Sequence, residues 1–199
     1  MIGKGKSISH GVAALEYDLA KEINGQAVAT EIARHELYGC TGAEMVQEMK
    51  PYHIDFPNVK NNCLRFEVSP SIEESATFTD ADWAELGNDF MQRMGLANHQ
   101  YIIIRHSGTE SKKEQAHLHI LANRVSLSGE LYRDNWIGKK ATEAANAIAK
   151  ERNFVQSQDI GKVNKAEIKE AMDGVLKKMP GFDFTKFKED LGKRGFNVR

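Results

Sequence analysis

Three histidines have the type and spacing that could bind a metal ion. His117 and His119 are separated by one residue, and residues i and i+2 of a β-strand point to the same face of the sheet. His106 ends the β-branched run 101–106, so pairing of this run with 117–122 as a hairpin would bring His106 across from the pair. Three neutral imidazoles suit a divalent ion and leave positions open for a substrate oxygen. For the His-x-His pair alone, polar alternation on a surface strand is the alternative.

The residues around this pair resemble a motif of a known enzyme family. The stretch from His106 through His117-Leu118-His119 to Asn123-Arg124-Val125 is similar to the third motif of the relaxase and mobilization nuclease family, which belongs to the HUH endonucleases. The segments Gly5-Lys6-Ser7-Ile8-Ser9 and Ala13-Ala14-Leu15-Glu16-Tyr17 resemble the first motif of that family. The resemblance covers residues 1–155 and implies a mobilization protein of a plasmid or conjugative transposon.

The resemblance implies site- and strand-specific nicking and rejoining of DNA at an origin of transfer, which initiates conjugative mobilization. Tyr17 is the residue that matches the nucleophile of the family, and it would form a 5′-phosphotyrosine bond. A phenol has a pKa of about 10 and is a poor nucleophile at neutral pH, so the reaction needs a metal that polarises the phosphate. Without the resemblance, a structural tyrosine of an amphipathic helix is the more frequent explanation for Tyr17.

The resemblance also implies a cofactor and partners. The expected cofactor is Mg²⁺ or Mn²⁺, and zinc remains possible because imidazoles bind these ions alike. The expected partners are single-stranded DNA at an origin of transfer and accessory mobilization proteins.

Glu67 is the candidate for an acidic residue that supports the histidines. The acid that many family members carry soon after the first histidine is displaced here, because Ser107-Gly108-Thr109 precedes Glu110. Glu67 occupies the middle-strand position and could hydrogen-bond a metal-bound imidazole and fix its tautomer. An exposed glutamate on a half-buried strand is the alternative.

Further residues could contact the DNA backbone, although a structural salt bridge or a solvated charged surface would explain them as well. They are Arg124, Lys112, Lys113, Lys139 and Lys140. The remaining histidines have no ligand spacing and are expected at the surface or at helix caps; they are His10, His35, His53 and His99. Cys40 and Cys63 form no CxxC pair, so we expect two buried, inert thiols.

Hydrophobic periodicity predicts the elements that position these residues. Helices are expected at 11–23, 30–37 and 41–49, the last opened by a Thr41/Glu44 capping box. Residue alternation predicts a strand at 63–69. A helix capped by Thr79 should run to about Met94 and bury Trp83, Leu86, Phe90 and Met94.

The strands 101–106 and 117–122 should form a long-looped hairpin, and helices are expected at 139–152, 165–179 and 184–193. The fold class that follows is α+β, with a central antiparallel sheet flanked by helices, because no regular βαβ alternation appears. We expect a nuclease domain at 1–155 and a helical extension at 156–199.

Length and charge set further limits. A chain of 199 residues with 41% hydrophobic residues is long enough for one buried core. Residues 138–199 hold 14 Lys and Arg against 9 Asp and Glu, so the overall charge of −1 divides into +5 there and −6 for residues 1–137. The positive charge of residues 138–199 is typical of a surface that faces DNA, but a set of solvated helices would have the same composition. No signal peptide or membrane span is visible, and we expect a cytoplasmic protein.

Two other functions remain open from the sequence. A rolling-circle replication initiator would use the same chemistry without a transfer role. A non-catalytic DNA-binding accessory protein could hold a structural zinc at the three histidines, but a closed zinc site normally needs a fourth protein ligand and none lies at ligand spacing.

Overall fold

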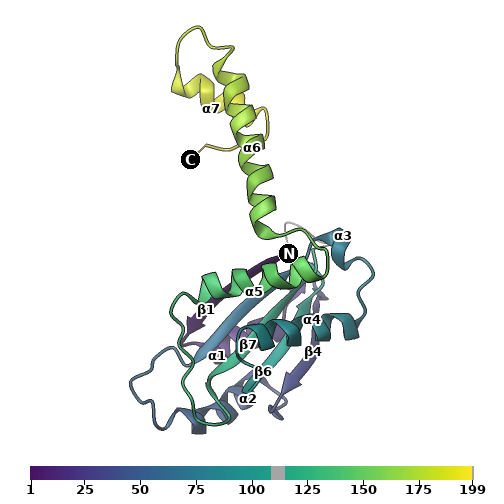
Figure 1. Cartoon of the computed structure of the whole chain (residues 1–199), viewed down its shortest axis with the longest axis vertical. Helices are drawn as coiled ribbons and strands as arrows, with labels where there is room; N and C mark the ends of the chain where they lie inside the picture. The colour runs from purple at the N-terminus through teal and green to yellow at the C-terminus, as the bar shows by residue number, and fades with distance from the viewer. Residues whose placement is uncertain (109–114, 199) are drawn as a thin grey trace. The chain divides into compact units, whose positions relative to one another are not determined.

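Five antiparallel strands form the sheet that carries the histidines, in the order β1-β5-β7-β6-β4 (Figure 1). The strands are β1 (Ile2–Ile8), β4 (Ala29–His35), β5 (Cys63–Ser69), β6 (His99–His106) and β7 (His117–Ser126). β7 is the central strand, and β6 and β5 pair with it on either side. The predicted hairpin and the predicted α+β class are both confirmed.

The computed structural model describes residues 1–108 and 115–198. The chain divides into two units, Met1–Gln156 and Ser157–Arg199, and the sheet belongs to the first. In the described part of the chain, no helix has the length and apolar character needed to cross a membrane.

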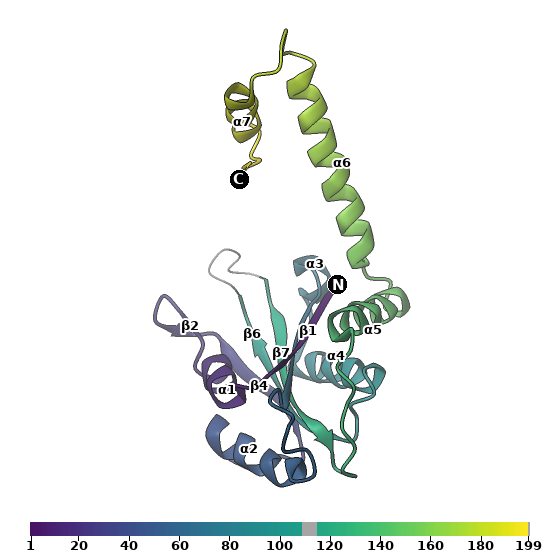
Figure 2. The ribbon, with the colours of Figure 1, turned by 90° about the vertical axis from the view of Figure 1, so that its left-hand side faces the viewer.

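Helices cover both faces of the sheet, as Figure 2 shows. On one face, α1 (Gly11–Leu19) and α2 (Gly42–Met49) pack on Ile102, Ile104 and Leu121. On the other face, α4 (Asp80–Arg93) and α5 (Ile137–Glu151) enclose the larger core, which includes Ile103, Leu118 and Ile120. Because alternate strand residues face opposite sides, β5, β6 and β7 each contribute to both cores.

The helix starts predicted from the sequence are confirmed at α2 and α4. The Thr41 side chain accepts from the backbone N–H of Glu44, and Thr79 and Asp82 form the same capping box before α4. The predicted stripe of α4 lies in the core, since Trp83, Leu86, Phe90 and Met94 are all buried. The caps fix where α2 and α4 begin, and the apolar stripe fixes which face of α4 meets the sheet.

β1 was not expected as a strand, because glycines and lysines have low β propensity. Tertiary packing explains it. A Cβ atom on Gly3 would lie 2.4 Å from the carbonyl oxygen of Ala141, and one on Gly5 would lie 3.2 Å from the Ala141 Cβ, so α5 can approach only a glycine surface. Lys4 and Lys6 alternate with these glycines and therefore project from the opposite face of the sheet.

Two of the predicted helices differ from the structure. The helix expected at 30–37 is wrong: residues 30–35 lie in β4, which pairs with β6 at the sheet edge. Tertiary pairing overrides the helix propensity of Ala, Glu and Arg there. The helix expected at 11–23 ends at Leu19, and a short hairpin of β2 (Glu22–Ile23) and β3 (Gln26–Ala27) follows. Its turn, Asn24-Gly25, has positive φ at both residues, as a two-residue hairpin turn requires.

The second unit contains α6 (Ser157–Leu176) and α7 (Phe184–Gly192), which bury a small core of their own around Ala171, Val175, Phe187 and Leu191. α6 starts eight residues before the expected start at Lys165. Two short helices of the first unit were also not predicted, η1 (Lys50–His53) and α3 (Ile72–Ser75).

Candidate active site

The three histidines meet on the face of the sheet that α1 covers. His106 lies directly across from His117 in the β6–β7 register, and His119 is two pairs further along, opposite Ile104. Their ring centroids are 4.5 to 5.4 Å apart. Each offers a ring nitrogen, and these atoms all lie within 4.8 Å of one another. The expectation that the histidines converge from two adjacent central strands is confirmed.

The hydrogen bonds that two of the rings make to backbone carbonyls leave their inner nitrogens unprotonated. His106 Nε2 lies 2.7 Å from the backbone oxygen of Asp18, and His117 Nδ1 lies 3.1 Å from that of Gln115. A carbonyl oxygen only accepts, so each of these nitrogens carries the proton. The lone pairs then belong to His106 Nδ1 and His117 Nε2. Donation of the second ring N–H to a backbone carbonyl is the usual arrangement around metal-bound histidine.

The separation of two nitrogens also fits a shared ion. His117 Nε2 and His119 Nε2 are 3.1 Å apart. Two nitrogens about 2.1 Å from one ion, in tetrahedral or octahedral geometry, lie about 3.0–3.4 Å from each other. His106, His117 and His119 therefore have the donor set and spacing of a metal site with open positions.

Burial keeps the imidazoles of His106 and His119 neutral. Burial, together with the neighbouring rings of His106 and His117, lowers the pKa of His119 to about 2. Burial also lowers the pKa of His106, although its bond to the Asp18 carbonyl acts in the opposite direction. Neutral imidazole is the form that binds metals, so both residues are ready to act as ligands near pH 7.

α1 brings a buried carboxylate to the histidines. Asp18 is 1% exposed, and its carboxylate accepts from Arg65 Nε at 3.0 Å and from Arg65 Nη2. Asp18 Oδ1 lies 3.9 Å from His119 Nδ1, and Arg65 Nη2 donates toward the same nitrogen at 3.3 Å. Burial raises the pKa of the Asp18 carboxyl, and the bonds from Arg65 oppose that shift. Sequence reasoning missed Asp18 and Arg65; their only signal was the position of Asp18 directly after the expected nucleophile.

Tyr17 lies on the same helix and is 56% exposed. Its hydroxyl accepts a hydrogen bond from Lys21 Nζ at 2.7 Å. The charge of Lys21 contributes to the lowered pKa of His106, so this lysine lies near the histidines as well as at the tyrosine. The expected nucleophile is therefore accessible, and the charge of its partner Lys21 is close enough to His106 to contribute to the lowered pKa of that imidazole.

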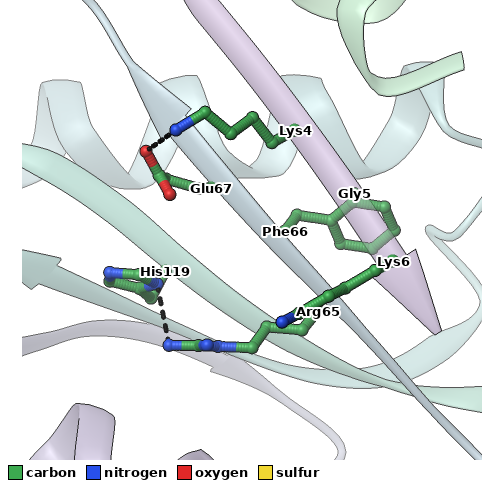
Figure 3. A pocket seen from close by; sticks show the side chains of 7 residues that line it. All are labelled: Lys4, Gly5, Lys6, Arg65, Phe66, Glu67 and His119. Carbon is green, nitrogen blue, oxygen red and sulfur yellow. Dashed lines mark hydrogen bonds and ion pairs between the residues drawn. The ribbon is translucent and has the colours of Figure 1, made fainter. Parts of the chain in front are cut away.

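Glu67 lies on β5 beside His119 in the register, but its carboxylate bonds to Lys4 Nζ at 2.8 Å (Figure 3). Among the described residues, the carboxylate recorded near a histidine of the cluster is that of Asp18. Glu67 therefore makes no recorded bond to a clustered histidine, and the carboxylate beside His119 belongs to Asp18 of α1.

Three of the residues expected at DNA lie on the other side of the sheet. Arg124 alternates with Leu118 and Ile120 and faces the α4–α5 side, where it donates to Asp134 at 2.7 Å. Lys139 and Lys140 are on α5, on that same side; Lys139 pairs with Glu143, and Lys140 donates to the Arg133 carbonyl. Lys112 and Lys113 lie outside the described residues. Contact of all four lysines and Arg124 with DNA stays a prediction.

Several minor expectations need correction. Cys63 is buried as expected, but Cys40 is exposed because it precedes α2 in a surface turn. His99 is buried rather than superficial: its Nδ1 donates to the Asn123 carbonyl, and Asn123 Oδ1 is bonded to His53 Nε2. Asn123 therefore bonds to both His53 and His99, four residues along β7 from His119.

Comparison with known proteins adds a family but little fold detail. No curated protein matches the chain. Two solved structures described as the conjugative relaxase TrwC in complex with OriT DNA, one metal-free and one metal-bound, align with TM-scores of 0.46. They are 10% and 11% identical, with coverage of 96% of this chain and of 89% and 90% of theirs. Likeness at this level carries no argument about mechanism.

A family model gives the clearer result. The model described as "Relaxase: MobA/VirD2-like, nuclease domain" matches residues 17–154. The match begins at Tyr17 and includes all three clustered histidines, Asp18 and Arg65. With that match extending over most of the chain, the protein belongs to the family of MobA/VirD2-like relaxase nuclease domains.

Proposed function

We propose that this protein nicks one DNA strand at an origin of transfer, keeps the 5′ phosphate on Tyr17, and later rejoins the ends to initiate conjugative mobilization. The observation that carries the proposal is the docking of α1 on the histidine cluster. One residue of this helix, Asp18, bonds to His106 and lies near His119, and the preceding residue is an exposed tyrosine. The substrate of the protein would be single-stranded DNA, and accessory mobilization proteins would assist at the origin of transfer.

His106 Nδ1, His117 Nε2 and His119 Nε2 would hold a divalent ion, for which we propose Mg²⁺ or Mn²⁺. When bound, the ion would polarise the scissile phosphate and stabilise the additional negative charge of the transition state. Binding of the ion through His119 Nε2 would place the ring proton on Nδ1, which would then no longer accept from Arg65 and would face Asp18 Oδ1, 3.9 Å away. Asp18 thus takes the positioning role that the sequence suggested for Glu67.

Tyr17 supplies the nucleophile. Its oxygen attacks the phosphorus, the bond between phosphorus and the 3′ oxygen breaks, and the departing 3′ oxygen takes up a proton as the phenol releases its own. The ammonium of Lys21, which already donates to the Tyr17 oxygen, stabilises the phenolate during the attack. The phosphotyrosine bond retains the energy of the phosphodiester, so attack by a 3′ hydroxyl rejoins the strand without a nucleotide cofactor.

The proposed function predicts a metal-dependent covalent adduct. The protein is mixed with a randomised single-stranded DNA library and Mn²⁺, and DNA that stays attached after denaturation in detergent is recovered and sequenced. We expect one enriched motif with Mn²⁺ or Mg²⁺ and no recovery with EDTA. Recovery that is equal with EDTA would contradict the metal role, and absence of any adduct with either ion would contradict the proposed function.

Asp18→Asn should weaken Mn²⁺ binding by about 10- to 100-fold, which is the usual effect of losing a group that orients a metal-bound histidine. The amide is nearly the same size, so the packing of α1 should persist. Glu67→Gln is the matched control and should leave Mn²⁺ affinity unchanged, because its carboxylate bonds to Lys4. Titration calorimetry measures the Mn²⁺ affinity of both variants. If Glu67→Gln weakened Mn²⁺ binding and Asp18→Asn did not, the positioning residue would be Glu67.

A further inference from the structure

A pocket of about 220 Å³ opens beside the histidine cluster, on the same face of the sheet (Figure 3). β1, β5 and β7 each contribute to its lining, and His119 is shared between the pocket and the cluster. The polar groups that line it are Lys4, Lys6, Arg65, Glu67 and His119. We call it the lysine pocket.

Strand register explains why the cations gather there. Lys4, Glu67 and His119 form one row across β1, β5 and β7, and Lys6 pairs with Arg65 in the next row on that face. Adjacent strands are about 4.8 Å apart, so the Cα atoms of Lys4 and His119 are on the order of 10 Å apart. Gly3 and Gly5 hold the other face of β1 against α5, which fixes the side from which both lysines project.

The cationic side chains of the pocket have hydrogen-bond donors that are available to a ligand. Lys6 has no hydrogen bond or ion pair with any residue that the structure describes. Lys4 pairs with Glu67, but their side chains are 64% and 34% exposed, and such a surface pair is weak. Arg65 uses Nε and Nη2 for Asp18, which leaves its Nη1 without a bond to a described residue.

The local charge is opposite to that of its surroundings. Residues 1–137 carry a net charge of −6, whereas Lys4, Lys6 and Arg65 together exceed the two nearby carboxylates, Glu67 and Asp18, by one charge. The lysine pocket is thus a positively charged patch in an acidic region, next to the site that would hold the scissile phosphate. Such a patch suits another phosphate of the same DNA strand.

We propose that the lysine pocket binds a phosphate of the DNA strand neighbouring the scissile one, with Lys4 and Lys6 as positioning residues that set where the strand enters the histidine site. This inference rests on the proposed function. Contacts to phosphates fix register without reading bases. Binding in the lysine pocket therefore orients the DNA strand whatever its sequence. Glu67 lowers the affinity for the phosphate because it competes for Lys4.

Because the contact is independent of sequence, a fluorescein-labelled oligo(dT) is a suitable probe, and fluorescence anisotropy measures its binding at several NaCl concentrations. Each phosphate contact with a single strand contributes about 0.7 to the slope of log Kobs against log salt. The double variant Lys4→Ala, Lys6→Ala should therefore lower the slope by about 1.4 and weaken binding at about 0.1 M NaCl by about 25-fold. Glu67→Gln should have the opposite effect and strengthen binding, because it frees Lys4.

The control is the double variant Lys50→Ala, Lys60→Ala, which removes the same charge from exposed lysines of the same unit outside the pocket. It should change Kd less than about 3-fold, the weak long-range effect expected at this ionic strength. An equal loss in both double variants, an unchanged slope for the Lys4/Lys6 variant, or weaker binding by Glu67→Gln would each overturn the inference. The assay uses no cleavage, so these results are separate from the fate of the Tyr17 adduct.

Discussion

Tyr17→Phe is expected to abolish both cleavage and the covalent protein–DNA adduct. The change keeps the ring and its contacts on α1 but removes the oxygen that would attack the phosphorus. Loss of a nucleophile removes most of the rate enhancement of an enzyme, so cleavage should fall by more than about 10³-fold. Affinity for oligo(dT) should change little, because the lysine pocket and the histidines are untouched. Denaturing electrophoresis of labelled DNA measures the adduct.

Tyr38→Phe is the matched control. Tyr38 is 76% exposed and its hydroxyl donates to Glu36, so it has the accessibility of a nucleophile but no link to the histidines. This variant should cleave and form the adduct like the unaltered protein. If Tyr17→Phe still formed the adduct and Tyr38→Phe did not, the nucleophile would be Tyr38.

Removal of two histidines should eliminate the metal and with it the reaction. In the double variant His117→Ala, His119→Ala, only His106 remains of the cluster, and one imidazole cannot hold a divalent ion tightly. Mn²⁺ affinity should fall by more than about 100-fold, exceeding the effect of a residue that only orients a ligand. Cleavage should fall by about 10³-fold or more, because the ion supplies several kcal/mol of transition-state stabilisation.

His10→Ala serves as its control, since His10 is exposed at the start of α1 and lies outside the cluster. It should bind Mn²⁺ with unchanged affinity in calorimetry. Circular dichroism checks that the double variant retains its fold without metal. Undiminished Mn²⁺ binding by the folded double variant would rule out the histidine cluster as the metal site.

The histidine cluster was predictable because it depends on local rules. His117 and His119 share a face by strand alternation, and a hairpin of two β-branched runs needs only a turn between them to bring His106 opposite. The capped helix from Asp80 was predictable for the same reason, since its Thr79 cap and its apolar stripe lie within one segment.

Features that depend on partners distant in sequence were not predictable in this way. β1 is a strand because its glycines let α5 approach, and β4 is a strand because β6 pairs with it, so neither has a strong signal of its own. Asp18 meets Arg65, a residue 47 positions away, and nothing local to Asp18 indicates that contact. The place of Glu67 on the middle strand predicts that it lies beside His119. It does not predict that the Glu67 carboxylate bonds to Lys4 instead.

Mass spectrometry of the covalent adduct tests the central claim most directly. Protein that has reacted with the DNA library and Mn²⁺ is treated with nuclease and trypsin, and the modified peptide is sequenced. Trypsin cuts after Lys6 and Lys21, so Tyr17 lies in the peptide Ser7–Lys21, which contains no other tyrosine. We predict a nucleotide attached through its 5′ phosphate to Tyr17 in this peptide. A nucleotide on any other residue, or an unmodified Ser7–Lys21 peptide in protein that has cut DNA, would contradict the assignment of Tyr17 as the nucleophile.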